Sequence, residues 1–492
     1  MPAASSNRKL AILLASVAAL GGLLFGYDTA VISGAVGAID HNFIAPRHLS
    51  ETAANTLSGW TVSSALFGCI LGSLVAGRCG DWLGRRNGMM VSAILFFISA
   101  LGSSMPEIGF APVGQVGPEA LAPFICYRIL GGVAIGLAST LCPLYIAEIS
   151  PPQSRGWLVA LQQMAIVTGI FITYFVNWGI ASQGSHFWVI TTGWRYMLAS
   201  MTLPATLFFV LLFLVPDTPR WLVMKGRRDE ARGVLARLGT PDVARTVEEI
   251  AISYEEQAEN QARLNAFGWP VVVIGVLIGM FQQFVGINAV MYYAPLMFQN
   301  MGAAGNNAFL ASILLGGVNF VSTVGVLFVI DRVGRKPLLL FGSCLMTVAM
   351  LALGIFFTLQ YQGAAMILAI LVYMFAFAVS WGPVAWVLMA EMFPNSIKGK
   401  AMPIAVASSW IANLFVSVTF KILDGDSILN RTFHHGFAYL LYAVISLGTV
   451  WFVIRFVPET KGLRLEAIEE IWRGEVSPQS SEVNAREAAG AI

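Results

Sequence analysis

Long apolar runs recur along the whole chain and are separated by short polar segments. Each run has about the 20 residues that a helix needs to cross a bilayer. Six runs lie on either side of one longer charged segment, and they cover residues 9–36, 57–77, 87–105, 121–147, 157–180 and 195–215, then 267–299, 308–330, 337–359, 364–391, 400–421 and 437–457. The pattern predicts an all-α membrane protein with twelve transmembrane helices.

The seventh run differs from the others because it carries amides and a phenol inside its apolar sequence. Gln282, Gln283, Asn288 and Tyr292 all lie within it. On a straight helix Gln283 and Asn288 would point about 140° apart, so they meet at one ligand only if the helix faces a broad cavity or breaks, as it could at Gly286. Neutral hydrogen-bonding groups suit an uncharged ligand with several hydroxyls. The same amides could instead join neighbouring helices.

Composition narrows the class of protein. The chain is 57% hydrophobic and only 11% charged, whereas a soluble domain has about 25% charged residues. The sequence contains no metal-ligand cluster, nucleotide-binding loop or paired nucleophile and base, so we expect no enzyme activity, no metal and no cofactor. The lipid bilayer is the partner that this composition implies, and we expect no nucleic acid.

Lys and Arg gather in alternate loops, which predicts the orientation of the chain. They follow the second, fourth, eighth and tenth runs and fill the central segment, while most of the opposite loops have none. Both termini are therefore expected in the cytoplasm. We predict a first six-helix half over 1–218, a cytoplasmic linker of short amphipathic helices over 219–266, a second half over 267–460 and a cytoplasmic tail over 461–492. A short amphipathic stretch in the tail, 465–472, precedes an end that we expect to be disordered.

Three loop motifs occur twice in the same order, which indicates an internal duplication. The pairs are Asp81–Arg86 with Asp331–Lys336, Ala147–Gly156 with Ala390–Gly399, and Pro216–Arg220 with Pro458–Lys461. Two halves with parallel topology are typical of transporters that rock around a site at the interface of the halves.

The same motifs, together with Gly21–Gly34, Gln282–Asn288 and Ser380–Val384, resemble the sugar porter family of the major facilitator superfamily. The resemblance covers nearly the whole chain. It implies the major facilitator fold and alternating access in a bacterial inner membrane, by a protein that functions as a monomer. It also implies import of a monosaccharide together with a proton, with D-xylose as the first candidate. The alternatives are symport of a hexose or polyol, facilitative uniport of a sugar, and nutrient sensing.

The resemblance also implies which residues hold the sugar. Hydroxyls would be bound by Gln163, Gln282, Gln283, Asn288, Tyr292 and Asn319, and aromatic faces would come from Phe25, Trp386 and Trp410. Gly382 and Pro383 would let the tenth span bend beside the sugar. Alone, each tryptophan could equally be a packing or interface residue.

The chain departs from the xylose-importing members of the family at three positions. Ser409 and Ile170 stand where those members have glutamine, and Met201 stands where they have an acidic residue. We therefore expect Ser409 to change one contact to the sugar, and Met201 to change details of the proton circuit.

Two ionisable residues lie well inside apolar runs. Asp28 is in the first run and Arg128 in the fourth. Ionisable groups within membrane spans are rare and usually functional. A carboxylate that can be protonated and released from its partner would carry the coupled proton, and a permanent structural ion pair is the alternative. Facilitative carriers of the family have asparagine at the position of Asp28, so the resemblance favours symport.

A cytoplasmic gate is expected from the repeated charged loops. Its residues would be Arg85, Arg86, Glu148, Arg155, Arg335, Glu391 and Lys398. Ion pairs that cross between the halves would hold the outward-facing state closed at the cytoplasmic side. The alternative is that the cations only set the orientation of the loops.

Overall fold

The structure, a computed structural model, describes residues 7–109, 111–112, 114, 116–151, 154–259, 263–264, 266–303, 305–461 and 472. The regular elements of these residues are helices, and twelve of them are long and apolar enough to span a membrane. The prediction of twelve spans is confirmed. The second span starts at Glu51, earlier than predicted, because its polar first turns are also helical, with Thr56 Oγ1 donating to the carbonyl oxygen of Thr52.

The chain divides into two compact units. Unit 1 comprises Met1–Leu49, Trp60–Asn260 and Gly305–Ile313, and unit 2 comprises Ser50–Gly59, Gln261–Ala304 and Leu314–Ile492. Most of the charged central segment, up to residue 260, therefore belongs to unit 1. The first turns of the second span belong to unit 2, where Asn55 donates a hydrogen bond to the carbonyl oxygen of Gly425.

Unit 1 contains the first six spans, whose small residues let the helices pack closely. Its elements are α1 (Arg8–Val31), η1 (Ile32–Gly34), α2 (Val36–Ile39), η2 (Asp40–Ile44), η3 (Ala45–Arg47), most of α3 (Glu51–Leu83), α4 (Arg85–Ser104), η4 (Pro118–Ala120), α5 (Leu121–Ile149), α6 (Arg155–Ala181), α7 (His186–Trp188), η5 (Val189–Gly193), α8 (Trp194–Ala199) and α9 (Thr202–Leu212). A Cβ on Gly26 would lie 1.9 Å from the Ile166 carbonyl oxygen, and one on Gly132 would lie 1.8 Å from that of Ala65. Only glycine permits these close contacts of α1 with α6 and of α5 with α3.

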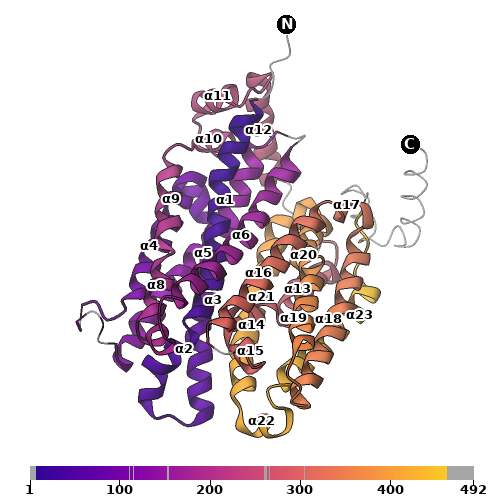
Figure 1. Cartoon of the computed structure of the whole chain (residues 1–492). Helices are drawn as coiled ribbons and strands as arrows, with labels where there is room; N and C mark the ends of the chain where they lie inside the picture. The colour runs from indigo at the N-terminus through magenta and orange to yellow at the C-terminus, as the bar shows by residue number, and fades with distance from the viewer. Residues whose placement is uncertain are drawn as a thin grey trace. The chain divides into compact units, whose positions relative to one another are not determined.

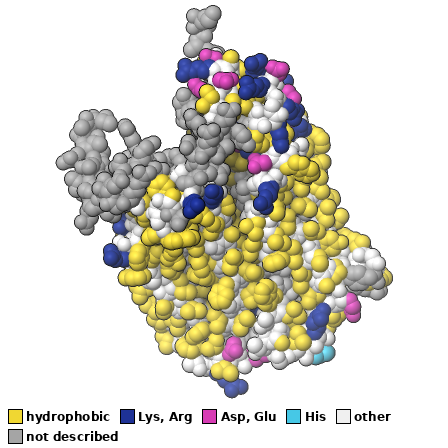
Figure 2. All heavy atoms as spheres, turned by 180° about the vertical axis from the view of Figure 1, so that it is seen from behind, with side chains coloured by type: hydrophobic (Ala, Val, Ile, Leu, Met, Phe, Trp, Pro, Cys, Tyr) yellow, Lys and Arg dark blue, Asp and Glu magenta, His cyan; other side chains and the backbone are white. Residues whose placement is uncertain are grey.

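The predicted short amphipathic helices are α10 (Pro219–Met224), α11 (Arg228–Arg237) and α12 (Val243–Glu259). They pack together at the end of unit 1 where α1 begins (Figure 1), and the backbone amide of Asn7 donates to the carbonyl oxygen of Leu238. Val234 and Leu235 are buried. Charged side chains gather over this end on the face seen in Figure 2, whereas hydrophobic side chains dominate the rest of that face. This distribution is expected for a chain that leaves the bilayer here.

Unit 2 contains the last six spans, two of which are broken. Its elements are α13 (Trp269–Phe284), α14 (Ile287–Tyr292), α15 (Ala294–Asn300), most of α16 (Asn306–Leu327), α17 (Ile330–Val333), α18 (Arg335–Thr358), α19 (Ala364–Ala378), α20 (Trp381–Met392), α21 (Asn395–Gly425), α22 (Ser427–Phe433) and α23 (Phe437–Phe456). In its interior α18 packs on α19 and α23, and α13 packs on α21.

The seventh span breaks at Gly286, as the sequence suggested. Gly286 has a φ of 95°, in the left-handed region, and a Cβ there would lie 2.7 Å from the ring of Tyr442. The backbone therefore turns where any other residue would be both strained and obstructed. The hydroxyl of Tyr373 donates to the carbonyl oxygen of Val285 at 2.8 Å, which satisfies one of the backbone groups that the break leaves unpaired.

The tenth span breaks slightly earlier than the predicted bend at Gly382 and Pro383. α19 ends at Ala378 and α20 begins at Trp381, so Val379 and Ser380 form the break. Pro383 lies in the first turn of α20, where a proline is tolerated, and its missing N–H cannot bond the carbonyl of Val379. The proline thus produces a break on its N-terminal side.

The predicted tail helix over 465–472 and the end after it lie outside the described residues, except for Trp472. The indole N–H of Trp472 donates to the carbonyl oxygen of Met392 at 3.1 Å, at the end of α20.

Candidate functional site

A cluster of hydrogen-bonded amides lies at the break of the seventh span in unit 2. Asn288 Nδ2 donates to Gln283 Oε1 at 2.6 Å, and Gln283 Nε2 donates to Ser409 Oγ at 3.2 Å and to Gln282 Oε1 at 3.4 Å. Gln282 Nε2 donates to the carbonyl oxygens of Trp381 and Gly382 at 3.0 and 3.2 Å. The cluster therefore joins α13 and α14 to α21 and to the start of α20.

The helix break is the reason that this cluster exists. A straight helix would place Gln283 and Asn288 about 140° apart, but the turn at Gly286 brings their side chains into direct contact. The sequence identified both residues and gave a break at Gly286 as one of two possible geometries, and their hydrogen bond shows that the chain adopts the broken one.

The side chains of the cluster differ in how many further hydrogen bonds they can make. Both amide hydrogens of Gln282 point to backbone carbonyls, so Gln282 fastens α13 to the broken tenth span. Ser409 Oγ accepts from Gln283 and keeps its own hydrogen as a donor. Asn288 keeps its carbonyl oxygen and one N–H. Asn288 and Ser409 can therefore each form a further hydrogen bond to a ligand hydroxyl.

The other residues predicted to hold the sugar belong to both units. In unit 2, Tyr292, Asn319 and Trp410 are buried, while Trp386 is half-buried. In unit 1, Gln163 on α6 and Phe25 on α1 are half-buried. Of the three departures from the family, Ser409 belongs to the amide cluster, whereas Ile170 and Met201 are buried apolar residues of unit 1. The contact of all these residues with one ligand stays a prediction.

Asp28 and Arg128 form a buried ion pair in the middle of unit 1. Arg128 Nη1 lies 2.6 Å from Asp28 Oδ1, and their side chains are only 3% and 0% exposed. Among the described residues, Asp28 Oδ2 and Arg128 Nε have no hydrogen-bond partner. The pair predicted from two distant positions is therefore in contact, and its carboxylate is incompletely satisfied.

Sequence reasoning missed a second buried ion pair in unit 1. Glu107, in the loop after α4, lies 2.7 Å from Nη1 of Arg195 on α8, and the carboxylate is fully buried. The available signal was an arginine directly after Gly193-Trp194 at the start of an apolar run and a lone acid after Pro106. Sequence alone does not show that these two residues meet.

The repeated charged loops form one cluster in each unit, at the start of α4 in unit 1 and at the start of α18 in unit 2. Arg85 makes two hydrogen bonds to Glu148, at 3.1 and 3.2 Å, and Arg335 makes two to Glu391, at 2.9 and 3.1 Å. Thr218 donates to Glu148, and Thr460 donates to Glu391 at 2.5 Å. All of these contacts lie inside one unit, so they order each loop set by itself. Ion pairs that cross between the halves stay a prediction.

A second acid in each cluster caps the helix that carries the arginine. Asp217 accepts from the backbone N–H of Arg86, and Glu459 accepts from those of Arg335 and Lys336. Burial raises the pKa of Asp217, while hydrogen bonding and the charge of Arg86 act in the opposite direction. The sequence marked these acids through the repeated Pro216 and Pro458 motifs but gave them no role.

The remaining predicted gate residues have separate places. Arg86 donates from Nε to the carbonyl oxygen of Leu212 at 3.0 Å, at the end of α9. Lys398 donates to the carbonyl oxygen of Ala390, near the end of α20. Arg155 is the first residue of α6, and its side chain lies outside the description.

Twelve apolar helices, broken spans with buried amides at one break, and duplicated charged loops define a polytopic membrane carrier. The chain matches the family described as "Sugar (and other) transporter" over residues 14–472. It belongs to this family.

Two similar proteins of known description differ in their transport mode. The D-xylose-proton symporter of Escherichia coli K12 is 47% identical over 93% of this chain and 95% of its own length. The glucose facilitated diffusion protein of Zymomonas mobilis is 48% identical over 96% of this chain and 99% of its own length. The inward-open structure of the E. coli xylose transporter matches with a TM-score of 0.84 at 44% identity, covering 93% of this chain and 99% of the other.

Proposed function

We propose that this protein imports a monosaccharide together with a proton, with D-xylose as the first candidate. The observation that carries the proposal is the amide cluster of Gln283, Asn288 and Ser409 at the break of the seventh span. A sugar presents several uncharged hydroxyls, each of which can donate one hydrogen bond and accept up to two. The remaining donor and acceptor capacity of Asn288 and Ser409 supports binding of such a ligand without any fixed charge.

Proton coupling is supported by the ion pair of Asp28 and Arg128. Desolvation favours the neutral form of a buried carboxylate, whereas a neighbouring guanidinium favours the charged form. A rearrangement that separates the two groups would therefore promote protonation of Asp28, and their renewed contact would expel the proton. One proton moving down a membrane potential of 100 mV contributes about 2.3 kcal/mol to uphill accumulation of the sugar.

The coupling test compares the parent with Asp28→Asn in proteoliposomes. Asparagine is nearly isosteric and does not titrate, so we expect sugar binding and exchange down a gradient to persist while uphill accumulation driven by a pH gradient is lost. Counterflow measures the exchange and shows that the variant is folded. Accumulation by Asp28→Asn against a sugar gradient would disprove coupling through this residue.

Facilitated diffusion is the second candidate, because a relative with that description is 48% identical to this chain. A uniporter would bring the sugar to equal concentrations on both sides of the membrane, whatever the pH gradient. If the parent protein exchanges sugar but never accumulates it under a proton gradient, uniport is the correct assignment. Competition of unlabelled pentoses and hexoses against labelled xylose would then identify the sugar in either case.

The proposed location is a bacterial inner membrane, with both termini in the cytoplasm and the protein active as a monomer. The charged α10–α12 segment and the Arg85 and Arg335 clusters support this orientation because cations favour the cytoplasmic side. The two clusters would act as the cytoplasmic gate of an alternating-access cycle. Their matched construction, with acid, arginine and threonine in each, supports a role beyond orientation of the loops.

A further inference from the structure

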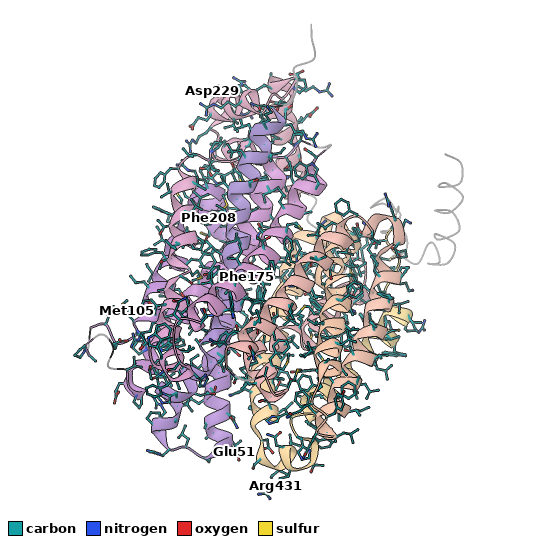
Figure 3. The ribbon with its side chains drawn as sticks, viewed as in Figure 1. Glu51, Met105, Phe175, Phe208, Asp229 and Arg431 are labelled. Atoms are coloured by element: carbon teal, nitrogen blue, oxygen red, sulfur yellow. The ribbon has the colours of Figure 1, made fainter. Side chains whose placement is uncertain are left out.

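The ion pair of Glu107 and Arg195 lies at the end of α4 opposite to the Arg85 cluster. Figure 3 labels Met105, at the end of α4, well away from Asp229 on α11, at the charged end of unit 1. Glu107 Oε1 contacts Arg195 and accepts the backbone N–H of Gly114 at 2.8 Å, while Arg195 Nη1 also donates to the carbonyl oxygen of Ser104. Among the described residues, Glu107 Oε2 and Arg195 Nη2 have no hydrogen-bond partner.

Two buried serines lie on α4, in the two turns that precede Glu107 in the chain. Ser99 and Ser103 are one helical turn apart and both are buried, and within the described chain their hydroxyls also have no partner. A Cβ on Gly131 would lie 2.4 Å from Ser99 Oγ and 3.8 Å from Asp28 Oδ1. The Ser99 hydroxyl and the Asp28 carboxylate therefore face the same small space beside Gly131.

Unpaired polar atoms are costly in a protein interior within a membrane, so a series of them indicates a function. We propose that Glu107 takes up the transported proton at the outer end of unit 1 and passes it to Asp28 along Ser103 and Ser99. This inference rests on the proposed proton symport and on the proposed orientation. In this relay the Glu107 carboxylate takes up a proton that comes from the outer side, the proton moves along the hydroxyls of Ser103 and Ser99 and any water between them, and the Asp28 carboxylate accepts it, which returns Glu107 to its charged form.

The charged and titratable groups around the route fit such a relay. Arg195 faces Glu107, and Arg128 faces Asp28. The thiol of Cys69 on α3 is close enough to interact electrostatically with Asp28 and Arg128. The hydroxyl of Tyr27, next to Asp28 in the sequence, is bonded to Ser200 at 2.7 Å. Met201, in the sixth span, is a buried apolar residue and does not titrate.

The competing explanation is a purely structural clasp that holds α8 against α4. The guanidinium of Arg195 lies over the ring of Trp194, which packs with Phe43 and Phe124, so the pair certainly contributes to packing. A clasp would affect sugar exchange and proton-driven uptake equally. A relay would affect only the steps in which a proton enters.

The experiment uses the full-length protein in proteoliposomes and compares Glu107→Gln with Glu119→Gln. Glu119 is an exposed acid in the same loop and serves as the matched control. We expect Glu107→Gln to slow xylose accumulation driven by a pH gradient by about tenfold or more, with xylose counterflow and affinity unchanged. Glu107→Asp should restore most of the rate, and the pH profile of uptake should change in Glu107→Gln alone.

If Glu107→Gln does not fold, a second variant that leaves the buried charges unchanged still tests the inference. The double variant Ser99→Ala with Ser103→Ala should also slow proton-driven accumulation and spare counterflow. Parental accumulation in the folded Glu107→Gln protein, parental accumulation in the double serine variant, or equal loss of accumulation and counterflow would overturn the relay. If the parent itself shows no proton-driven accumulation, the proposed symport fails first and the relay fails with it.

Discussion

The position of the Asn288 side chain depends on the backbone conformation of a single glycine. Its amide reaches Gln283 only because Gly286 adopts a left-handed conformation between them. The carbonyl oxygen that Asn288 retains is the acceptor that we assign to a sugar hydroxyl. Loss of a buried partner costs about 1–3 kcal/mol, because the remaining group stays desolvated and unpaired.

We therefore expect Asn288→Ala to weaken xylose binding about ten- to hundredfold. Isothermal titration calorimetry on the purified protein measures the affinity directly. Gln299→Ala removes an amide from α15, in the same span but outside the cluster, and should leave the affinity near that of the parent. Equal affinities for all three proteins would place the sugar away from the amide cluster.

At the scale of single elements, the end of α21 is fastened to its neighbours by one buried carboxylate. Asp424 contacts Nδ1 of His435, before α23, at 3.1 Å and accepts from Nδ2 of Asn300, at the end of α15, at 3.3 Å. The hydrogen bond to Asp424 raises the pKa of His435, while partial burial opposes this effect. These contacts join α15, the last part of the broken seventh span, to α21 and to the start of the last span.

This pair makes the stability of the protein depend on pH. Because the folded-state pKa of His435 is raised, its stabilisation is complete below the ordinary histidine pKa of about 6.5 and is lost as pH rises through the folded-state value. When the pH is raised from below to above the pKa of His435, we expect the Tm of the parent to fall by about 1–2 °C more than the Tm of His435→Gln. Differential scanning fluorimetry in detergent measures the difference.

His186→Gln, which removes an exposed histidine of unit 1, is the control for general effects of histidine titration. It should show the same pH dependence of Tm as the parent. If His435→Gln also follows the parent at every pH, then the contact with Asp424 does not contribute to stability.

At the scale of the whole molecule, the duplication gives both units the same charged construction. Gly84 and Gly334 have φ values of 96° and 102°, and the carboxylates of Asp217 and Glu459 lie where a Cβ of each glycine would be obstructed. The arginine that follows each glycine then reaches Glu148 or Glu391 with two hydrogen bonds. An alternating-access cycle needs such rigid loop ends on both units, since a gate transmits motion only through ordered elements.

Arg335→Ala should raise the accessibility of a cysteine introduced at the proposed cytoplasmic face of unit 2, because it removes the ion pair with Glu391 that orders this loop of the proposed gate and so shifts the balance towards the inward-facing state. Labelling rates with a membrane-impermeant maleimide measure the change. Lys336→Ala removes a neighbouring cation at the same face but leaves the arginine pair intact, and it should label like the parent. Equal labelling of both variants and the parent would mean that these cations only set the orientation.

The sequence by itself determined the twelve spans, the internal duplication and the family, and it marked Gly286 as a possible break in the seventh helix. These features depend on local properties: the number of apolar residues needed to cross a bilayer, the freedom of Gly286, and motifs that recur in order. The contact of Asp28 with Arg128 was also predictable, because a lone acid and a lone cation inside apolar runs need each other.

Only the tertiary structure decided which polar groups meet when several partners were available. It brought Glu107, in the loop after α4, to Arg195, which lies in a distant segment at the start of the sixth apolar run. It also paired Arg85 with Glu148 and Arg335 with Glu391, each pair within one unit. The side chain of Gln282 forms its hydrogen bonds with the backbone of the tenth span. The physical reason is that hydrogen-bond and ion-pair partners are chosen by the packing of whole helices, which a local pattern of residues does not contain.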